Sequence, residues 1–323
     1  MSRIYEALQK AESERSQEDR TRTPRTPEQV ANPAPSVNFE PLPQTAVVEA
    51  EYESAIPAPA RPRPAAPTAA AVMQEPLDLN KIERRPWSPV FARLPALLHR
   101  GPAVEQFRSL RSRIFELRDL GPLKTILISS GLPQEGKSFV SVNLAFSLAR
   151  HKNSKVLLID GDMRRYTMHQ ILGCESQPGL ADYLAGKASL VEVMQRPQEM
   201  PSTDSVKQPA LPNLTFIAGG NGGDRAADLS GSPRFGDLIR QASPYFDWII
   251  VDSSPVLPVS DAVNLARSCD GVLLVARGGV TKFPIAQRAQ SELKAAKVLG
   301  FVLNAVHEAP QVGSYYGYDS TNE

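Results

Sequence analysis

The stretch that decides the fold is Gly131-Leu132-Pro133-Gln134-Glu135-Gly136-Lys137-Ser138, which has the G-x-x-x-x-G-K-S spacing of a phosphate-binding loop. An apolar run at 125–129 precedes it, and residues 139–150 carry apolar side chains at helical spacing. In a strand–loop–helix unit, backbone N–H groups and the helix N-terminus surround an anion. Lys137 is therefore predicted to reach the outer phosphates of a nucleoside triphosphate, and the Ser138 hydroxyl to bind Mg²⁺. The other loop residues predicted to line the nucleotide are Gly131, Gln134, Glu135, Gly136 and Phe139.

Composition sets limits on the rest of the chain. With 323 residues and a formal net charge of +1, the chain is not expected to bind nucleic acid through its overall charge. Its two cysteines, Cys174 and Cys269, have no metal-ligand spacing and are predicted to be reduced thiols. No apolar run approaches the roughly 18 residues that a membrane-spanning helix needs, and the first residues do not resemble a signal peptide. These features predict a cytoplasmic protein.

Four segments are predicted along the chain. Residues 1–15 form a short amphipathic helix that docks on a partner or on the protein itself, or frays. Residues 16–98 hold about half of the 29 prolines and few apolar side chains, which is typical of a disordered linker. The Trp87-Ser88-Pro89-Val90-Phe91 patch near its end is either a docking element or the point where the linker meets the domain. A P-loop domain is predicted at 99–309 and a flexible tyrosine-containing tail at 310–323.

The domain alternates between strand-like and helical patterns. Strands are predicted at 124–129, 155–160, 214–218, 247–252, 271–275 and 299–304. Helices are predicted at 103–118, 138–150, 179–195 with a break, 234–243, 259–267 and 284–297, and a surface loop at 196–212. Repeated strand–helix alternation with apolar, β-branched strands predicts an α/β fold, in which a doubly wound and mostly parallel sheet is covered on both faces.

Acidic residues follow two of the predicted strands. Asp160 ends the run at 155–160 and Asp162 follows it, and Asp252 ends the run at 247–252. Ligands in such sheets bind beyond the carboxyl ends of the strands, so all three carboxylates are expected at the same edge as Lys137. There they would hold Mg²⁺, and an acid would accept a proton from a substrate hydroxyl or from water. The alternative is that each aspartate caps the turn that follows its strand.

Further polar residues near this edge leave alternatives open. Arg164 and Arg165 would meet phosphate or a neighbouring subunit, or lie on the surface as ordinary charges. Asn304, at the end of the last strand, would contact a base or ribose, or act as a structural cap. No Asn-Lys-x-Asp segment follows the later strands, which argues against a guanine-specific GTPase.

Four motifs together resemble the bacterial tyrosine kinases of exopolysaccharide and capsule assembly, which are deviant P-loop ATPases. The phosphate-binding loop resembles the Walker A sequence of that family, and Leu157-Leu158-Ile159-Asp160-Gly161-Asp162-Met163-Arg164 resembles its A′ motif. Ile249-Ile250-Val251-Asp252-Ser253-Ser254-Pro255 is similar to its Walker B motif. Glu105-Gln106-Phe107-Arg108-Ser109-Leu110-Arg111 fits the E-x-x-R-x-x-R pattern that joins subunits into a ring in this family.

The resemblance implies an ATP- and Mg²⁺-dependent protein-tyrosine autokinase that regulates polysaccharide polymerisation and export. Lys137, Asp160, Asp162 and Asp252 would be its catalytic residues, and Ser138, Asp162 and Asp252 would hold the metal. The tail residues Tyr315, Tyr316 and Tyr318 would accept phosphate in trans, and Glu105, Arg108 and Arg111 would make subunit contacts. The implied partners are further copies in a ring, a separate membrane-spanning co-polymerase that recruits the chain to the inner face of the plasma membrane, and a phosphotyrosine phosphatase.

This chain departs from the family pattern at several positions. Gln134 replaces a common glycine, Tyr166 a common proline, and Ser253-Ser254 the usual Thr-Pro. The alternatives to a kinase are an ATPase switch without kinase activity and a nucleotide-binding scaffold of the polysaccharide machinery.

Overall fold

The computed structural model describes residues 77–152, 154–198 and 213–306, all of which belong to one unit of the chain. The helix predicted at 1–15, the linker up to residue 76 and the tail at 310–323 lie outside the described residues.

A single sheet runs through the described residues, and eight strands form it in the order β1-β4-β5-β3-β6-β2-β7-β8. The strands are β1 Glu83–Arg85, β2 Thr125–Ser130, β3 Val156–Asp160, β4 Met194–Pro197, β5 Leu214–Ile217, β6 Trp248–Asp252, β7 Gly271–Arg277 and β8 Val298–Asn304. Every neighbouring pair is parallel except β4 with β5, which is antiparallel. The predicted mostly parallel sheet is confirmed.

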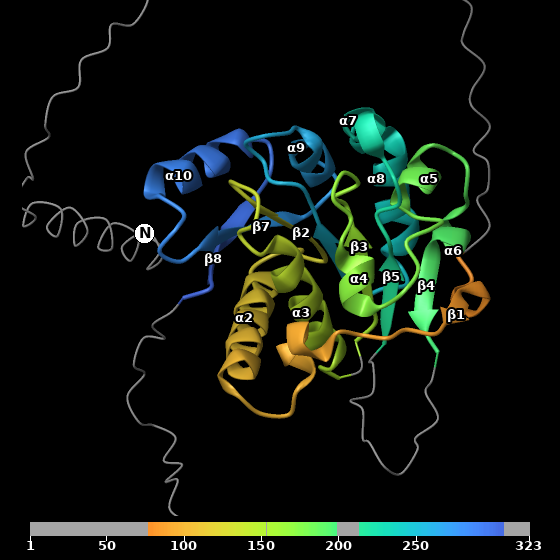
Figure 1. The fold of residues 1–323 in the computed structure, drawn as a ribbon, viewed down its shortest axis with the longest axis horizontal. Coiled ribbons are helices and arrows are strands. Elements are labelled where there is room, and N and C mark those ends of the chain that lie inside the picture. Colours follow the sequence, from red (N-terminus) through yellow and green to blue (C-terminus); the bar gives the residue numbers. More distant parts are fainter. Residues whose placement is uncertain (1–76, 153, 199–212, 307–323) are drawn as a thin grey trace, which may run out of the picture. The chain divides into compact units, whose positions relative to one another are not determined.

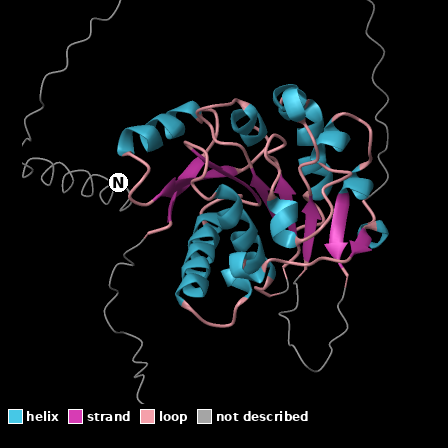
Figure 2. Ribbon diagram, in the orientation of Figure 1, coloured by secondary structure: helices cyan, strands magenta, loops and turns pink. Residues whose placement is uncertain are grey.

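Helices cover both faces of the sheet, as Figure 1 and Figure 2 show. One face packs against α2 Pro102–Asp119, α3 Lys137–Ala149 and α4 Met168–Leu172. The other packs against α5 Leu180–Leu184, α6 Leu190–Val193, α7 Ala226–Ser230, α8 Pro233–Ala242, α9 Asp261–Ala266 and α10 Phe283–Glu292. The strands supply both cores because successive side chains point to opposite faces: Ile126 and Ile128 lie in one core and Leu127 in the other. The doubly wound arrangement is therefore confirmed.

Short elements account for most differences from the sequence prediction. The structure adds β1, β4, α4 and α7, together with 3₁₀ turns at Leu79–Lys81, Phe91–Arg93, Pro95–Leu97 and Gly223–Arg225. Arg196 belongs to β4, so the predicted surface loop at 196–212 begins too early. Each added element has five residues or fewer, which is too short for a periodic apolar pattern to show in sequence.

The start of the domain is also corrected, because residues 77–98 pack on the sheet instead of forming the end of a linker. Trp87 is 4% exposed and its ring meets Phe216 edge-on, with 6.1 Å between ring centroids. Leu94 and Leu97 are fully buried in the same core. The backbone N–H groups of Ser88 and Val90 donate to carbonyls of the chain at 171–173. The Trp87 patch is thus docked on the chain's own domain.

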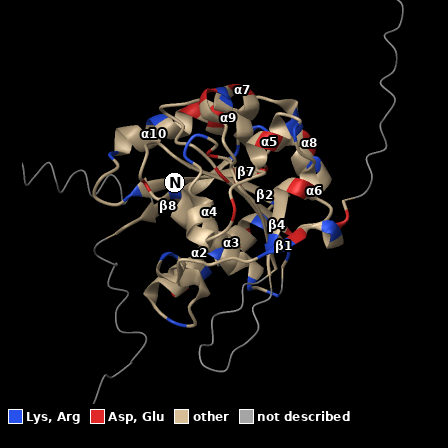
Figure 3. Ribbon diagram, turned by 45° about the vertical axis from the view of Figure 1, so that its right-hand side comes forward, with Lys and Arg blue, Asp and Glu red and all other residues tan. Residues whose placement is uncertain are grey.

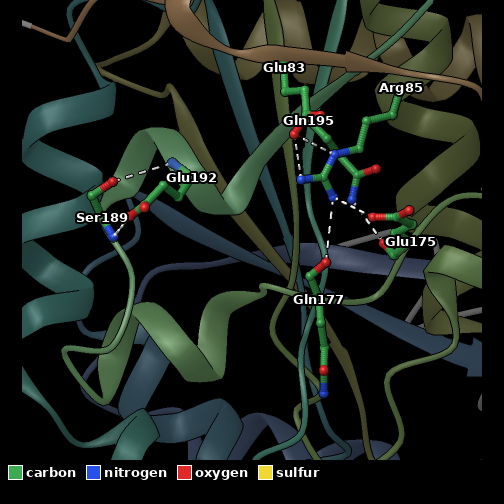
Figure 4. A network of polar contacts seen from close by, with 7 residues as sticks. All are labelled: Glu83, Arg85, Glu175, Gln177, Ser189, Glu192 and Gln195. Atoms are coloured by element: carbon green, nitrogen blue, oxygen red, sulfur yellow. Dashed lines mark hydrogen bonds and ion pairs between the residues drawn. The ribbon is translucent and has the colours of Figure 1, made fainter.

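A polar network ties β1 to the edge of the sheet (Figure 4). The Arg85 guanidinium contacts Glu83 at 2.7 Å and Glu175 at 2.8 Å, and only 15% of the Arg85 side chain is exposed. Gln195 on β4 donates to the Glu175 carbonyl at 2.9 Å. These contacts link β1, β4 and the loop before α5, so this three-residue strand is held by side chains as well as by its ladder.

Candidate functional site

The phosphate-binding loop has the strand–loop–helix context that its sequence predicts. β2 ends at Ser130 and α3 begins at Lys137, with Gly136 as the N-cap residue at φ 93°. A Cβ atom on Gly136 would lie 2.0 Å from Nδ2 of Asn304, so both the backbone angle and the space require glycine there. The loop therefore lies at the N-terminus of a buried helix, where backbone N–H groups favour an anion.

Gln134 adopts a conformation that suits glycine better than any other residue. Its φ is 64°, in the left-handed region, where a Cβ atom crowds the following carbonyl oxygen. The resemblance places a glycine at this position, and the structure gives the physical reason for that preference.

Glu135 holds the loop in place through both its side chain and its backbone. Its Oε2 accepts a hydrogen bond from the Leu132 N–H at 2.8 Å, and its Oε1 accepts one from the Thr281 hydroxyl. Nδ2 of Asn304 donates to the Glu135 carbonyl at 3.0 Å. Glu135 is 3% exposed, so these contacts hold the loop from the segment after β7 and from the end of β8. The sequence predicts that Glu135 contacts the nucleotide and that Asn304 contacts it or acts as a structural cap. In the structure both side chains hold the loop, and a contact with the nucleotide stays a prediction.

The strand-end acids come together beside Lys137, as predicted. Asp160 and Asp252 are register partners on β3 and β6, and both are almost fully buried, as is Asp162. The Ser138 hydroxyl donates to Oδ2 of Asp252 at 2.6 Å, and Ser141 Oγ lies 2.9 Å from Oδ1. The predicted phosphate-loop serine and strand-end acid are thus in direct contact.

Burial and mutual repulsion raise the pKa values of Asp160 and Asp252. Burial raises the pKa of Asp252 to about 6, and the nearby Lys137 charge opposes that shift. Burial raises the pKa of Asp160 well above its ordinary value, and the Asp252 charge adds to the rise. Two buried carboxylates at one sheet edge therefore favour a cation between or beside them.

Asp160 and Asp162 also shape the turn that follows β3. Asp160 accepts hydrogen bonds from the N–H groups of Asp162 and Met168, each at 3.2 Å, and Asp162 accepts one from Arg165 at 3.0 Å. A Cβ atom on Gly161 would lie 2.5 Å from the Asp252 carbonyl oxygen. The glycine between the two acids therefore lets this turn approach the end of β6. The capping alternative holds for both acids alongside their place in the site.

Arg164 forms an ion pair within the chain. Its Nε lies 2.7 Å from Oδ2 of Asp261, whose side chain is only 2% exposed at the start of α9. This pair links the turn after β3 to α9 beside the site. Sequence reasoning did not single out Asp261 or Thr281, because each lies about a hundred or more residues from its partner and belongs to no motif.

The arrangement fits Mg²⁺ bound together with a nucleotide. In residues 77–152, 154–198 and 213–306, no three His, Cys, Asp or Glu side chains are grouped closely enough to hold a metal ion. Mg²⁺ is usually held by one or two carboxylates together with phosphate oxygens and water. Ser138 and Asp252, hydrogen-bonded at a helix N-terminus that favours phosphate, match that donor set.

The predicted subunit contacts lie on α2. Arg108 contacts Glu105 at 2.5 Å within the chain, and Arg111 donates to the Ser147 carbonyl on α3 at 2.9 Å. The predicted acceptors Tyr315, Tyr316 and Tyr318 lie outside the described residues. Among the helices of the described part, none is both long and apolar enough to cross a bilayer.

Comparisons with known proteins relate the chain to bacterial tyrosine-protein kinases. No protein-family model matches the chain. The tyrosine-protein kinase YwqD of Bacillus subtilis is 32% identical over 221 residues, which are 68% of this chain and 87% of that protein. The tyrosine-protein kinase ptk of Acinetobacter johnsonii is 33% identical over 209 residues, 64% of this chain. The match spans 27% of the length of ptk, so the chain covers about a quarter of this relative.

A solved structure supports the same relationship. The kinase domain of the Escherichia coli tyrosine kinase ETK is 30% identical and superposes with a TM-score of 0.58, covering 69% of this chain and 84% of that one. Because YwqD is similar along most of its own length, the chain belongs to the bacterial tyrosine-protein kinase family.

Proposed function

We propose that the chain is a protein-tyrosine autokinase that uses ATP and Mg²⁺ and regulates exopolysaccharide polymerisation and export. The observation that carries the proposal is the Ser138–Asp252 hydrogen bond beside Lys137, at the N-terminus of α3. It joins a phosphate-binding loop to a strand-end acid on a fold that bacterial tyrosine kinases share.

Each residue of the site has a distinct task in this proposal. When bound, Mg-ATP would supply the γ-phosphoryl group, with ADP as the leaving group, and the cation that neutralises the phosphate charge. Lys137 would attract the outer phosphates, while Ser138 and Asp252 would hold the cation, with Asp162 contacting it directly or through water. Asp160 orients the tyrosine hydroxyl and accepts its proton on a carboxylate oxygen; burial raises the pKa of Asp160 well above its ordinary value, which makes the carboxylate a stronger base. Catalysis then rests mainly on positioning and electrostatic stabilisation.

The acceptor comes from a second copy of the chain. Tyr315, Tyr316 and Tyr318 occupy a terminal segment rich in glycine and polar residues, which suits entry into a neighbour's site. Glu105 and Arg108 remain partly exposed on α2, with 58% and 45% of their side chains accessible, and Arg111 lies beside them. These residues would join the copies. Phosphorylation adds about 1.5 to 2 negative charges per tyrosine, which would expel a tail from an acidic interface.

Partners beyond the chain follow from the family resemblance. The proposed activator is a membrane-spanning polysaccharide co-polymerase on a separate chain, which would bring the kinase to the inner face of the plasma membrane. A phosphotyrosine phosphatase would reset the cycle.

Phosphotyrosine mapping separates this proposal from its rivals. Wild type and Lys137→Met are incubated with Mg-ATP, alone and with the cytosolic segment of the proposed activator, and hydrolysis and phosphotyrosine are measured together. We expect tail phosphotyrosine in wild type and a loss of about 100-fold or more in the variant. Hydrolysis without phosphotyrosine under both conditions would favour an ATPase switch. ATP binding without turnover would favour a scaffold.

A further inference from the structure

A cavity of about 280 Å³ lies between α2, the C-terminal end of α3 and the 3₁₀ turn at 95–97. Its lining residues are Ala96, Val104, Arg108, Arg111, Ser147, Arg150, His151 and Lys152. Ser147 is ten residues along α3 from Lys137, which is about 15 Å of helix. The cavity is therefore separate from the phosphate-binding loop.

The lining of this cavity is strongly basic. It contains three arginines, one lysine and one histidine, and no acidic residue. Lys and Arg positions are blue in Figure 3, which shows them on α2 and around α3. Among the described residues, the carboxylate that acts on Arg111 is that of Glu105, which is already paired with Arg108. At least three positive charges thus share the cavity without a carboxylate partner in its lining.

Arg111 is the residue that points most clearly to a ligand. One of its terminal nitrogens donates to the Ser147 carbonyl at 2.9 Å, while its Nε is buried and has no hydrogen-bond partner among the described residues. Burial and repulsion from Arg108 and Arg150 lower the pKa of Arg111. A buried donor without a partner is costly, and a bound anion would satisfy it.

Helix electrostatics explains only part of this cluster. Basic residues stabilise a helix C-terminus through its macrodipole, which accounts for Arg150 and Lys152 after α3. Arg150, however, donates to the carbonyls of Ala96 and Leu98, and Arg108 and Arg111 come from a different helix. Their convergence on one cavity needs a further reason.

We propose that this cavity binds a small phosphorylated anion, at a site distinct from the nucleotide site. Guanidinium groups match phosphate oxygens in pairs, and three of them here surround one space. The volume lies just below the range of about 300–1,000 Å³ typical of small-molecule pockets, which suits a phosphoryl or pyrophosphoryl group. Because Arg108 and Arg111 also belong to the proposed subunit motif, anion binding would couple a phosphorylated ligand to assembly.

Calorimetric titration with inorganic pyrophosphate tests the site. The full chain is first saturated with Mg-ADP, so that the phosphate-binding loop is filled, and pyrophosphate is then added. We expect one further binding event in wild type, weakened about tenfold in Arg111→Gln and severalfold in Lys152→Gln. Lys152 is exposed, so its variant remains informative if Arg111→Gln folds poorly. Arg113→Gln is the matched control, since that arginine lies on α2 with 74% of its side chain exposed, outside the cavity.

Three results would overturn the proposal. One is no pyrophosphate binding to the Mg-ADP-saturated wild type. Another is equal weakening in Arg113→Gln and the two cavity variants. The third is the combination of two results: sedimentation shows self-association that depends on Arg111, and titration shows no pyrophosphate binding. The cavity would then bind a carboxylate of a second copy of the chain. Failure of Mg-ADP itself to bind would count against the proposed kinase instead, and the titration would then be run without nucleotide.

Discussion

Gln134 has an unfavourable backbone conformation that the contacts of the phosphate-binding loop impose. Its backbone is left-handed, at φ 64°, and this conformation costs an L-residue roughly 1–2 kcal/mol. The loop keeps the conformation because Glu135 and Gly136, the next two residues, are fixed by Thr281 and Asn304. The left-handed conformation of Gln134 therefore follows from the contacts of the two residues after it.

Replacing Gln134 with glycine is expected to raise the free energy of unfolding by up to about 1 kcal/mol, because relief of strain outweighs the added freedom of the unfolded chain. Urea unfolding measures the change. Gln134→Ala, which keeps the Cβ atom, is the control and should show no gain. A loss of stability in Gln134→Gly would mean that the glutamine side chain makes a stabilising contact.

Asp252 makes stability depend on pH. Its pKa is about 6 in the folded protein and about 3.9 in an unfolded chain. The folded state therefore binds the proton more tightly, and stability falls as pH rises from about 4 to 6. The ionised form of Asp252 lowers the free energy of unfolding, and a bound cation would remove this destabilisation.

Asp252→Asn, studied without divalent cations, should be more stable than wild type at pH 7. The advantage should shrink by about 1 kcal/mol between pH 7 and pH 5, because wild-type Asp252 becomes protonated. Chemical unfolding at both pH values checks this. An advantage, or a deficit, that is the same at pH 5 and pH 7 would contradict the burial argument.

At the scale of elements, the phosphate-binding loop depends on two segments distant in sequence. The turn after β7 supplies the Thr281 hydroxyl, which also accepts from the Arg277 N–H at 2.8 Å, and β8 supplies Asn304. The edge of the sheet that includes β7 and β8 therefore positions the loop as well as covering the core.

Thr281→Val keeps the shape of the side chain but leaves Glu135 and the Arg277 N–H each short of a partner. It should lower the free energy of unfolding by about 1–3 kcal/mol and weaken nucleotide binding severalfold. Unfolding and ADP titration measure the two effects. Thr281→Ser retains the hydroxyl and should behave much like wild type; equal losses in both variants would assign the effect to packing.

Local patterns explain what could be predicted from sequence. The loop at 131–138 and the acids after β3 and β6 follow directly from motifs beside apolar strands, so their convergence could be expected. Contacts between segments distant in sequence create the Thr281 and Asp261 interactions and the cavity that Arg111 lines. No local pattern in the sequence reveals such contacts. In sequence, residues 77–98 resemble the linker, because their few apolar side chains stand among prolines and form no periodic pattern.

At the scale of the molecule, the domain begins before residue 98, and Trp87 tests this. Trp87→Ala should cost about 3–5 kcal/mol, because a large buried ring is lost. Val90→Ala is the control, since Val90 is 43% exposed in the same segment, and it should cost less than about 1 kcal/mol. Thermal unfolding compares the two. A small and equal effect in both variants would mean that the segment does not pack on the domain and belongs to the linker.

The central claim is that the Lys137 site transfers phosphate to the tail of another copy. One measurement tests it most directly: a Lys137→Met chain, which keeps its tyrosines, is mixed with a chain that carries Phe at 315, 316 and 318 but keeps its site. The mixture is incubated with Mg-ATP and the phosphopeptides are mapped. The account predicts phosphotyrosine on the tail of the Lys137→Met chain in the mixture, and none in either chain alone. Phosphorylation of the Lys137→Met chain by itself would contradict the account. So would the absence of phosphotyrosine in the mixture when wild type, incubated in parallel, is phosphorylated.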